Sequence, residues 1–493
     1  MDILYTEKYD KYDPSSIEAY AKRLIGHSFR DVLIADSERT RDEAQTSYDA
    51  PAHEQTLEYY ESKAAKGSLG HLLEEHFFHY PINSDSDPDF KEAGVELKVT
   101  PFKENKNGSL SAKERLVLTI IDYMSVTDET FESSHLFNKC KLMLLIYYMH
   151  SNNSDKLDFQ IKYADLFQIP PEDMKIIQDD FNFIVNKIKA GKAHELSEGD
   201  TCYLGASTKG ATAAKSQRQQ PFSDTPAKQR AFCFKTSYMT YILNNYIIPG
   251  HKTYERINFS GNFEKHILDT INQNTGTILS ELLTKYDIHY TGKRPKNLES
   301  SLVLRMLGVK TDMAEEFVKA GIVVKTIRLE PNDSLRETVS FPAFDFIELV
   351  NETWEDSDIH NYLLETKFLF VVFKKDMEYE YFKKIKDHSG MDNHLYLDFA
   401  AFWNMPVDDI EQDVYSVWNK TRQVISEGIQ TEQHGSRTFN NLPASKDNRV
   451  CHIRPHAKNK DDVLPLPNGG SFTKQSFFLN NTYVRDEILK LRK

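Results

Sequence analysis

The sequence has little cysteine, no long hydrophobic run and no excess of positive charge. Its four cysteines stand singly, without the paired spacing of a zinc site or the density of a disulfide framework, which favours a reducing compartment. The longest apolar stretch, residues 142–149, is far shorter than the roughly 20 apolar residues of a membrane span. The N-terminus also lacks the apolar core of a signal peptide. We therefore expect a soluble, cytoplasmic protein.

The net charge of −13 argues against a protein that coats polyanions indiscriminately. It leaves room for a specific nucleic-acid site, because charges are screened over roughly 8 Å at physiological salt and local patches decide contacts. A length of 493 residues is too great for one ordinary core and predicts about two to four domains.

One short segment occurs twice, complete in the first copy and incomplete in the second. Residues 89–98 read DFKEAGVELK, and residues 316–325 read EFVKAGIVVK, at a shift of 316 − 89 = 227. The acid Glu96 of the first copy becomes Val323 in the second. The first copy can hold a cation between two carboxylates, whereas the second has lost one of them.

Two further pairs of segments repeat in the same order along the chain. Residues 138–145 match 366–373 at a shift of 367 − 139 = 228, and residues 231–238 match 476–483 at a shift of 477 − 232 = 245. This order predicts a duplicated α/β fold with a first lobe over residues 1–250 and a second over residues 260–493. We expect the second lobe to have another role than catalysis.

Hydrophobic periodicity places the first copy on a helix and two strands. Helices are predicted over residues 67–78 and over residues 171–189, and strands over 95–100 and 141–148. The charged N-terminal 65 residues look helical, with capping-box spacing from Ser15 to Glu18.

The alternation of a strand puts Glu96 and Lys98 on one face, because successive side chains point to opposite sides. Asp89 lies just before that strand, so two carboxylates converge and repel one another unless a cation occupies the gap. Oxygen ligands select a hard ion such as Mg²⁺, and Lys98 beside it can orient a water for attack on a phosphodiester. The alternative is an exposed strand face that carries the same residue types for solvation.

Other residues resemble a nuclease family. Pro88-Asp89 followed by Glu96-x-Lys98 resembles the motif of the PD…(D/E)XK nucleases, and Lys66-Gly-x-x-Gly-x-Leu-Leu-Glu74 is similar to the helix of MutH-type mismatch-repair endonucleases. Residues 134–141 resemble the downstream lysine strand of that family. The likeness to the Sau-type GATC-cutting type II restriction endonucleases covers the whole chain. It rests on residues 93–98, 111–118, 191–199, 228–232, 354–357, 364–370 and 453–456.

This resemblance implies two tandem MutH-like lobes, each a mixed sheet flanked by helices, of which the second is degenerate. It implies that Asp89, Glu96 and the Leu97 carbonyl hold Mg²⁺ and that Lys98 is the catalytic lysine. It further implies that Glu74 is a supporting acid and that Lys139 contacts phosphate.

The activity implied is cleavage of double-stranded DNA at GATC, before the G, with 5′-phosphate ends. A palindrome needs two cuts, so a monomer with one active lobe is expected to pair into a dimer on DNA. A DNA methyltransferase of the same specificity is implied as functional partner. The second lobe would bind another DNA site.

The residues expected to read DNA depart from the family in the first lobe. Where the family loop has Arg-Pro before its lysine, this chain has Ser207-Thr208 before Lys209, whereas Arg454-Pro455 with Lys458 stand in the second lobe. Residues 201–235 contain a single acid, Asp224, and six cations. These are Lys209, Lys215, Arg218, Lys228, Arg230 and Lys235.

The relatives have a tyrosine associated with sensing unmethylated adenine where this chain has Cys233. The smaller thiol leads us to expect that cutting tolerates adenine methylation. Three alternatives stay open: a mismatch-repair nicking enzyme, a non-catalytic DNA-binding protein, and a nuclease of this fold with another target.

Overall fold

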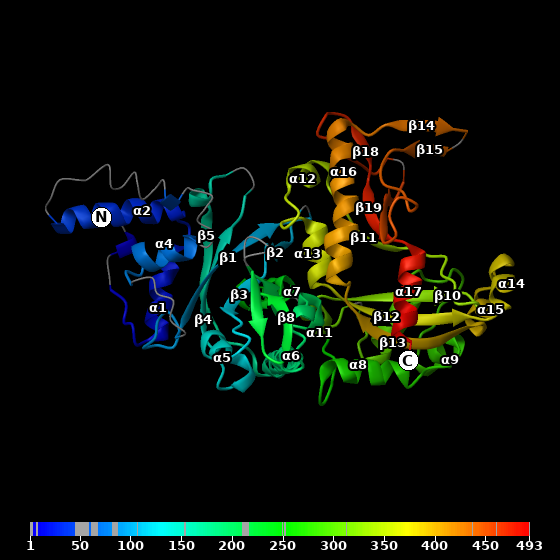
Figure 1. The fold of residues 1–493 in the computed structure, drawn as a ribbon, viewed down its shortest axis with the longest axis horizontal. Helices are drawn as coiled ribbons and strands as arrows, with labels where there is room; N and C mark the ends of the chain where they lie inside the picture. The colour runs from blue at the N-terminus through cyan, green and yellow to red at the C-terminus, as the bar shows by residue number, and fades with distance from the viewer. Residues whose placement is uncertain are drawn as a thin grey trace. The chain divides into compact units, whose positions relative to one another are not determined.

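The structure, a computed structural model, describes residues 3–5, 8–44, 59–60, 68–80, 87–105, 107–151, 154–209, 216–248, 250, 253–311, 313–435, 437–459 and 461–492. The chain separates into two compact units (Figure 1). Unit 1 comprises residues 1–253 and 318–320, and unit 2 comprises residues 254–317 and 321–493. Among the described residues, no helix combines the length and apolar character needed to cross a membrane.

The main sheet of unit 1 has the strand order β2-β1-β4-β5, with β1 and β4 parallel and β5 antiparallel to β4. Its strands are β1 (Glu96–Glu104), β2 (Leu110–Ala112), β4 (Met143–Met149) and β5 (Gln160–Phe167). Figure 1 shows α1 (Pro14–Ala21), α2 (Phe29–Ala44) and α4 (Ser68–His76) on one flank of this sheet. Buried leucines of α4 pack with Val95 and Leu97 in one core, which holds α4 against the start of β1.

A second sheet of unit 1 is antiparallel, in the order β3-β9-β6. It consists of β3 (Leu116–Ile120), β6 (Leu204–Thr208) and β9 (Arg230–Phe234). The buried carboxylate of Asp180 on α6 (Pro171–Lys189) accepts the backbone N–H groups of Cys202, Tyr203 and Leu204 at 2.8, 2.7 and 2.9 Å. Asp180 therefore fixes the start of β6 on α6.

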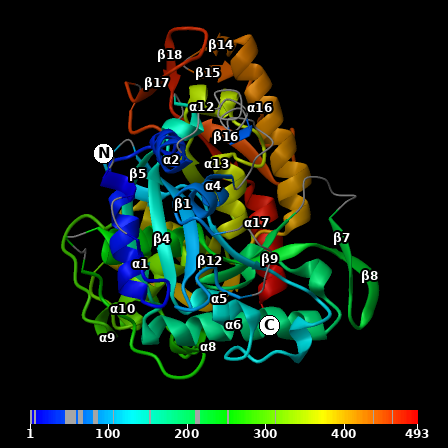
Figure 2. The same ribbon diagram turned by 90° about the vertical axis from the view of Figure 1, so that its left-hand side faces the viewer.

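The remaining elements of unit 1 are α5 (His135–Cys140), α7 (Thr236–Ile242) and a hairpin of β7 (Gln217–Gln220) and β8 (Ser223–Lys228). Figure 2 shows this hairpin extending beyond the strands of the second sheet. Of the cations in residues 201–235, only Arg218 and Lys228 lie exposed on the hairpin, and Lys235 is buried. Lys215 lies outside the described residues. The basic stripe that the sequence suggested is therefore divided between surface and core.

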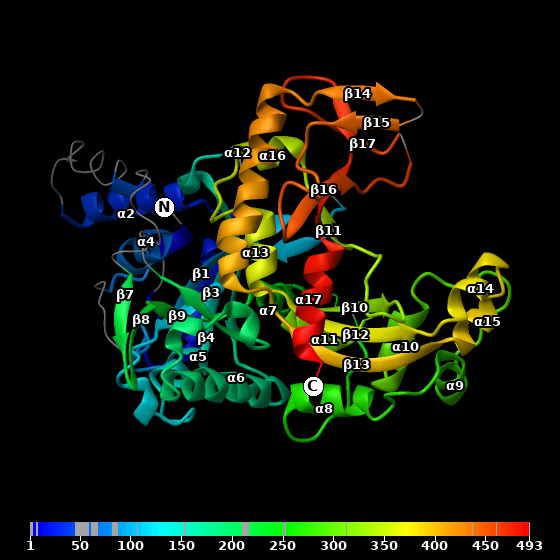
Figure 3. The ribbon, with the colours of Figure 1, turned by 45° about the vertical axis from the view of Figure 1, so that its right-hand side comes forward.

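Unit 2 contains two three-stranded sheets whose strands pair in the same directions as the corresponding strands of unit 1. Strand β10 (Ile322–Leu329) is parallel to β12 (Lys367–Lys375), which is antiparallel to β13 (Leu395–Trp403). These strands run side by side in Figure 3, with α8 and α9 next to β13. The second sheet has the antiparallel order β11-β19-β16. It consists of β11 (Val339–Ala343), β16 (Cys451–Pro455) and β19 (Gln475–Leu479).

The helices of unit 2 surround one large core. Trp354, Trp403 and Trp418 all belong to that core. The helices are α8 (Phe263–Asn272), α9 (Leu279–Lys285), α10 (Leu298–Met306), α11 (Glu315–Ala320, which ends in unit 1), α12 (Phe346–Asn351), α13 (Asp358–Glu365), α14 (Tyr379–Lys384), α15 (His388–Asn393), α16 (Tyr415–Glu427) and α17 (Asn481–Leu491). Two hairpins complete the unit, β14 (Thr431–His434) with β15 (Arg437–Asn440) and β17 (Val463–Pro465) with β18 (Ser471–Thr473).

Strand register tests the repeats found in the sequence. Glu96 pairs with Met143, and Val323 pairs with Phe368, so the second strands match at a shift of 368 − 143 = 225 and not at 228. The match of Lys139 with Lys367 was therefore wrong by three residues. A run of apolar residues has no distinctive side chain that would fix its register in a sequence comparison.

The third repeat keeps its expected register. Ser207 pairs with Ala231, and Arg454 pairs with Ser476, at the predicted shift of 476 − 231 = 245. Ser207 and Arg454 therefore occupy corresponding positions on the outer strands β6 and β16 of two similar sheets.

Most predicted elements in unit 1 are found within a few residues. The structure confirms the helix over residues 171–189 and strands close to 95–100 and 141–148, while Gly67 lies outside the described residues. Residues 135–140, expected as a strand, form a helix because the Ser134 hydroxyl caps it by accepting the Phe137 N–H. The cap of α1 is Asp13 rather than Ser15. All four cysteines are buried, and none forms a disulfide bond within the described part of the chain.

Candidate active site

A tight turn brings Asp89 to the start of β1. Phe90 and Val95 exchange backbone hydrogen bonds of 2.9 and 3.2 Å across the turn, and Gly94 within it has φ = 66°, where a side chain would be strained. The Asp89 carboxylate then accepts the Leu97 N–H at 2.8 Å. The turn therefore holds Asp89 beside the first residues of β1.

Glu96 is the buried acid of the site, with only 1% of its surface exposed. Its Oε1 accepts the Lys98 Nζ at 2.6 Å, and the Lys139 Nζ lies 3.3 and 3.4 Å from its two oxygens. Lys139 reaches it from α5. The expected pairing of Glu96 and Lys98 on one face is present, and Lys139, expected at a phosphate, contacts the same carboxylate here.

Glu74 on α4 lies in the electrostatic field of these groups. Burial, followed by the charges of Asp89 and Glu96, raises its pKa to about 7, while Lys98 and Lys139 act in the opposite direction. Burial and the charge of Glu96 also raise the pKa of Asp89, against Lys98 and the Leu97 N–H. The raised pKa values of Glu74 and Asp89 show an excess of negative charge in the site, which favours a cation.

The donor set at this site fits a hard cation that keeps part of its water shell. Asp89 and Glu96 offer carboxylate oxygens, and Leu97, whose carbonyl is the third donor, directly follows Glu96 in the chain. No group of three or more His, Cys, Asp or Glu side chains in the described part of the chain converges closely enough to enclose a metal. Two carboxylates and a carbonyl leave positions for water or phosphate oxygens, as Mg²⁺ requires.

Tyr80, which the sequence reasoning missed, lies beside these acids. Its N–H donates to the Glu74 carbonyl at 3.1 Å, and its ring packs edge-on against Phe90 with centroids 5.2 Å apart. Burial raises its pKa, and the charges of Asp89, Glu74 and Glu96 raise it further. No motif in the sequence could have indicated Tyr80, because its place depends on the packing of α4 against the turn.

The residues expected to read DNA in unit 1 differ in accessibility. Ser207 is buried and its hydroxyl lies 3.4 Å from the Ala231 carbonyl, whereas Thr208 is exposed. Lys209 is half-buried, and burial together with the nearby Arg115 and Lys98 lowers its pKa. Lys209 is therefore within the electrostatic field of Lys98.

Arg230 and Cys233 lie in the core of the second sheet. Arg230 is 5% exposed and donates to the Ala206 carbonyl at 2.6 Å. Cys233 is 0% exposed and pairs with Gly205. A side chain so placed reaches a nucleic acid only after rearrangement of the strand, so these positions favour a structural role for both residues.

Unit 2 keeps an acid at only one of the three acidic positions of the site. Leu72 and Leu73 of α4 and Leu302 and Val303 of α10 are fully buried pairs at a shift of 302 − 72 = 230, which puts Leu304 at the position of Glu74. Val323 replaces Glu96, and Glu316, at the position of Asp89, accepts the Ile257 N–H at 3.0 Å. Lys325, at the position of Lys98, donates instead to the Ser340 carbonyl at 3.0 Å.

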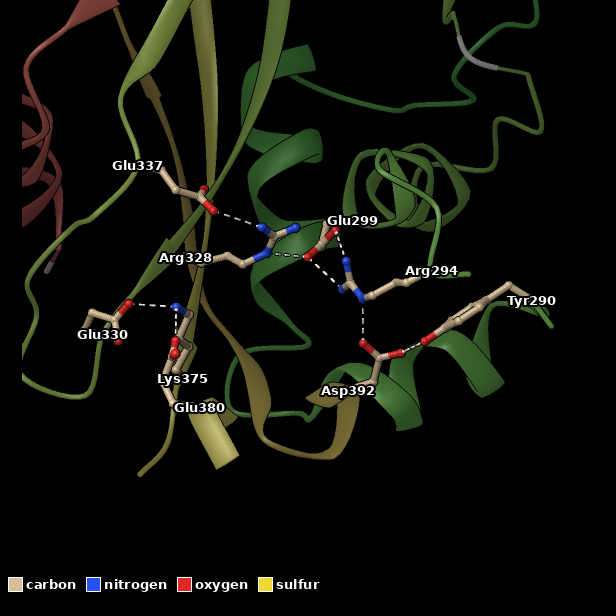
Figure 4. Close-up of polar contacts among 9 residues, drawn as sticks. All are labelled: Tyr290, Arg294, Glu299, Arg328, Glu330, Glu337, Lys375, Glu380 and Asp392. Atoms are coloured by element: carbon tan, nitrogen blue, oxygen red, sulfur yellow. Dashed lines mark hydrogen bonds and ion pairs between the residues drawn. The ribbon is translucent and has the colours of Figure 1, made fainter. Parts of the chain in front are cut away.

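An ion-pair network occupies the other end of α10 (Figure 4). Arg294 bridges Glu299 and Asp392 at 2.8 and 3.0 Å, and Arg328 on β10 contacts Glu299 at 2.7 Å. Burial alone would raise the pKa of Glu299, but the two arginines hold it below its usual value. This acid of α10 therefore binds the helix to the sheet.

Arg454, Pro455 and Lys458 are exposed in unit 2. The Arg454 guanidinium lies 3.3 Å from the Thr338 hydroxyl and 5.4 Å from the centre of the Phe478 ring. A guanidinium held in this way can still donate to an external acceptor.

Comparisons with known proteins agree with this geometry. Residues 78–180 match the model of the family described as DNA mismatch repair enzyme MutH, a range that contains Asp89, Glu96, Lys98 and Lys139. The chain is 38% identical over 471 residues to the type II restriction enzyme Sau3AI of Staphylococcus aureus, which covers 86% of this chain and 93% of that enzyme. The chain belongs to the Sau3AI family of type II restriction enzymes.

As a member of the Sau3AI family, the chain is a type II restriction endonuclease and binds DNA. Its fold is mixed α/β and contains a MutH-like domain. Restriction endonucleases generally use a divalent metal, and the oxygen donors of Asp89 and Glu96 suit this requirement.

Proposed function

We propose that unit 1 is the catalytic MutH-like domain and hydrolyses phosphodiesters of double-stranded DNA with Mg²⁺. The observation that supports this most strongly is the buried carboxylate of Glu96, shared by Lys98 at 2.6 Å and Lys139 at 3.3 Å. A buried acid with two cations, beside a second acid whose pKa is raised, is more than a solvated strand face requires.

Asp89, Glu96 and the Leu97 carbonyl would hold the cation. When bound, Mg²⁺ supplies a positive charge that stabilises the phosphate and makes water a better nucleophile. Lys98 is held by Glu96 and can orient the attacking water. Glu74, with a pKa of about 7, can accept a proton at neutral pH. Lys139 can contact a phosphate oxygen once the charge of Glu96 is shared with the cation.

Digestion of a plasmid with Mg²⁺ by the wild-type chain and Glu96→Gln tests this assignment. We expect Glu96→Gln to lower the cleavage rate by at least about a hundredfold, because one ligand charge and the anchor of Lys98 are lost. Glu104→Gln is the matched control, since Glu104 lies exposed at the other end of the same strand. Equal rates for wild type and Glu96→Gln would contradict the assignment.

The proposed target is GATC, cut before the G with 5′-phosphate ends. This rests on the resemblance to the Sau-type GATC-cutting enzymes, on similarity to Sau3AI over most of the chain and on Lys209 beside the catalytic face. Thr208 and Lys209 are the proposed contacts from unit 1. Sequencing the ends of digested plasmid tests both the site and the cut position, and ends that lack GATC would refute the target.

We propose that unit 2 is a degenerate MutH-like domain that binds a second DNA site without cutting. The loss of acids at Leu304 and Val323 supports the absence of catalysis, and the exposed Arg454, Pro455 and Lys458 support DNA contact. One active site per chain implies that a monomer pairs into a dimer on DNA. Plasmids with two sites should then be cut faster than plasmids with one, and equal rates would argue against this role.

The biological setting proposed is a cytoplasmic restriction–modification system with a DNA methyltransferase of matching specificity. We also propose that cutting tolerates adenine methylation, because the buried Cys233 stands where relatives have tyrosine and no phenol is present there to crowd a methyl group. Failure to cut plasmid methylated on both adenines of each site would refute this.

A further inference from the structure

The hydroxyl of Tyr80 is a buried donor that no described residue accepts. It has no hydrogen-bond partner among the residues that the structure describes, although the backbone and ring of Tyr80 are both well anchored. Its N–H donates to the Glu74 carbonyl, and its ring packs against Phe90, the neighbour of Asp89. The hydroxyl is therefore fixed close to the acids of the active site.

The hydroxyls of three neighbouring tyrosines have hydrogen-bond acceptors, in contrast to the hydroxyl of Tyr80. The hydroxyls of Tyr5, Tyr9 and Tyr20 donate to the carbonyls of His76, Phe78 and Phe77 at 2.6, 2.9 and 3.3 Å. These rings belong to the same aromatic cluster as Phe78 and Phe90. Packing in this cluster is thus compatible with satisfied hydroxyls, and the missing bond of Tyr80 calls for another acceptor.

The charge around Tyr80 indicates what that acceptor is. The carboxylates of Asp89, Glu74 and Glu96 all oppose ionisation of the phenol, so the group stays protonated as a donor. A buried donor without an acceptor is unfavourable, and such a group in a catalytic site is explained when a ligand brings the acceptor. The ligand expected between these carboxylates is a hydrated divalent cation.

We propose that Tyr80 is a positioning residue of the nuclease site, whose hydroxyl donates to a water molecule of the hydrated cation at Asp89 and Glu96. Tyr80 would orient that water and strengthen binding of the cation. The inference rests on the proposed Mg²⁺-dependent function and adds a group outside the known motif.

The test compares Tyr80→Phe with Tyr9→Phe, each of which removes one hydroxyl from the same aromatic cluster. In metal-free protein we expect Tyr80→Phe to melt at or above the midpoint of wild type, because no hydrogen bond is lost and an unsatisfied buried donor is removed. Tyr9→Phe loses its bond to the Phe78 carbonyl and should melt about 2–4 °C lower.

In the response to Mg²⁺, Tyr80→Phe should be the affected variant and Tyr9→Phe the unaffected one. The Mg²⁺ concentration needed to raise the melting midpoint by a given number of degrees should be about tenfold higher for Tyr80→Phe than for wild type. This corresponds to 1.4 kcal/mol of cation binding. That concentration should be unchanged for Tyr9→Phe. Cleavage by Tyr80→Phe should fall about tenfold at subsaturating Mg²⁺ and recover at saturation.

Two results would overturn the role of Tyr80. One is an unchanged Mg²⁺ requirement in Tyr80→Phe, and the other is a loss of metal-free stability equal to that of Tyr9→Phe. Failure of the proposed nuclease function would look different, since the wild-type chain would then show no Mg²⁺-dependent cleavage and Glu96→Gln would match it.

Discussion

Removing the charge of Glu74 should make the metal-free protein more stable at alkaline pH. The pKa of Glu74 is raised from 4.5 to about 7 by burial and by Asp89 and Glu96. The folded state therefore binds more protons than the unfolded state between these pH values, and stability falls as pH rises through that window. Each unit of pKa corresponds to about 1.4 kcal/mol, so the full difference is about 3 kcal/mol. Because Glu74 is only partly buried, solvent screening reduces this to about 1–2 kcal/mol.

Thermal unfolding of wild type and Glu74→Gln in EDTA, at pH 5 and at pH 8, measures the effect. The variant should gain about 3–6 °C relative to wild type at pH 8 and little at pH 5. Glu104→Gln is the control for loss of an exposed acid. Saturating Mg²⁺ should narrow the difference at pH 8, since the cation compensates the carboxylate charge. The reasoning is refuted if wild type and Glu74→Gln show the same change between pH 5 and pH 8.

Three further predictions follow from the geometry. Lys98→Gln should lower cleavage at least about a hundredfold while the melting midpoint stays within a few degrees, as measured by plasmid digestion and calorimetry. Asp180→Ala leaves three buried N–H groups without their acceptor and should cost about 3 kcal/mol or more of stability, visible as a lower melting midpoint. Cys233→Tyr should make cleavage of adenine-methylated plasmid slower than cleavage of unmethylated plasmid, and equal rates would argue against a role for this position.

The contact between Glu96 and Lys98 could be predicted from sequence because its geometry is local. Glu96 and Lys98 are two residues apart on a strand, so they share a face however the rest of the chain folds. Glu74 comes from another element, and its place next to Asp89 became evident only through the packing of α4 on β1. Lys139 was found by its motif, but its contact with Glu96 depends on a helix where a strand was expected.

The DNA-reading side could not be predicted to the same depth. Arg230 and Cys233 were selected by composition and by family position, yet both lie in the core of the β3-β9-β6 sheet. Charge in a sequence does not show whether a side chain faces solvent, because an arginine that donates to a backbone carbonyl can be buried. The register of Ser207 with Arg454 was predictable, since the aromatic residues of β9 and β19 are distinctive enough to align.

The different charges at corresponding positions of the two units follow from the electrostatic free energy that closely spaced acids cost. In unit 1, Glu74, Asp89 and Glu96 raise one another's free energy in the ionised state, which a binding site tolerates because a ligand compensates it. In unit 2 apolar Leu304 and Val323 remove that repulsion, and Glu299 on α10 is instead neutralised by Arg294 and Arg328. Unit 1 therefore keeps three acids close together, whereas the acid of α10 in unit 2 is neutralised by two arginines. Such a change stabilises a domain that no longer needs the cation, which is the physical basis for assigning catalysis to unit 1 alone.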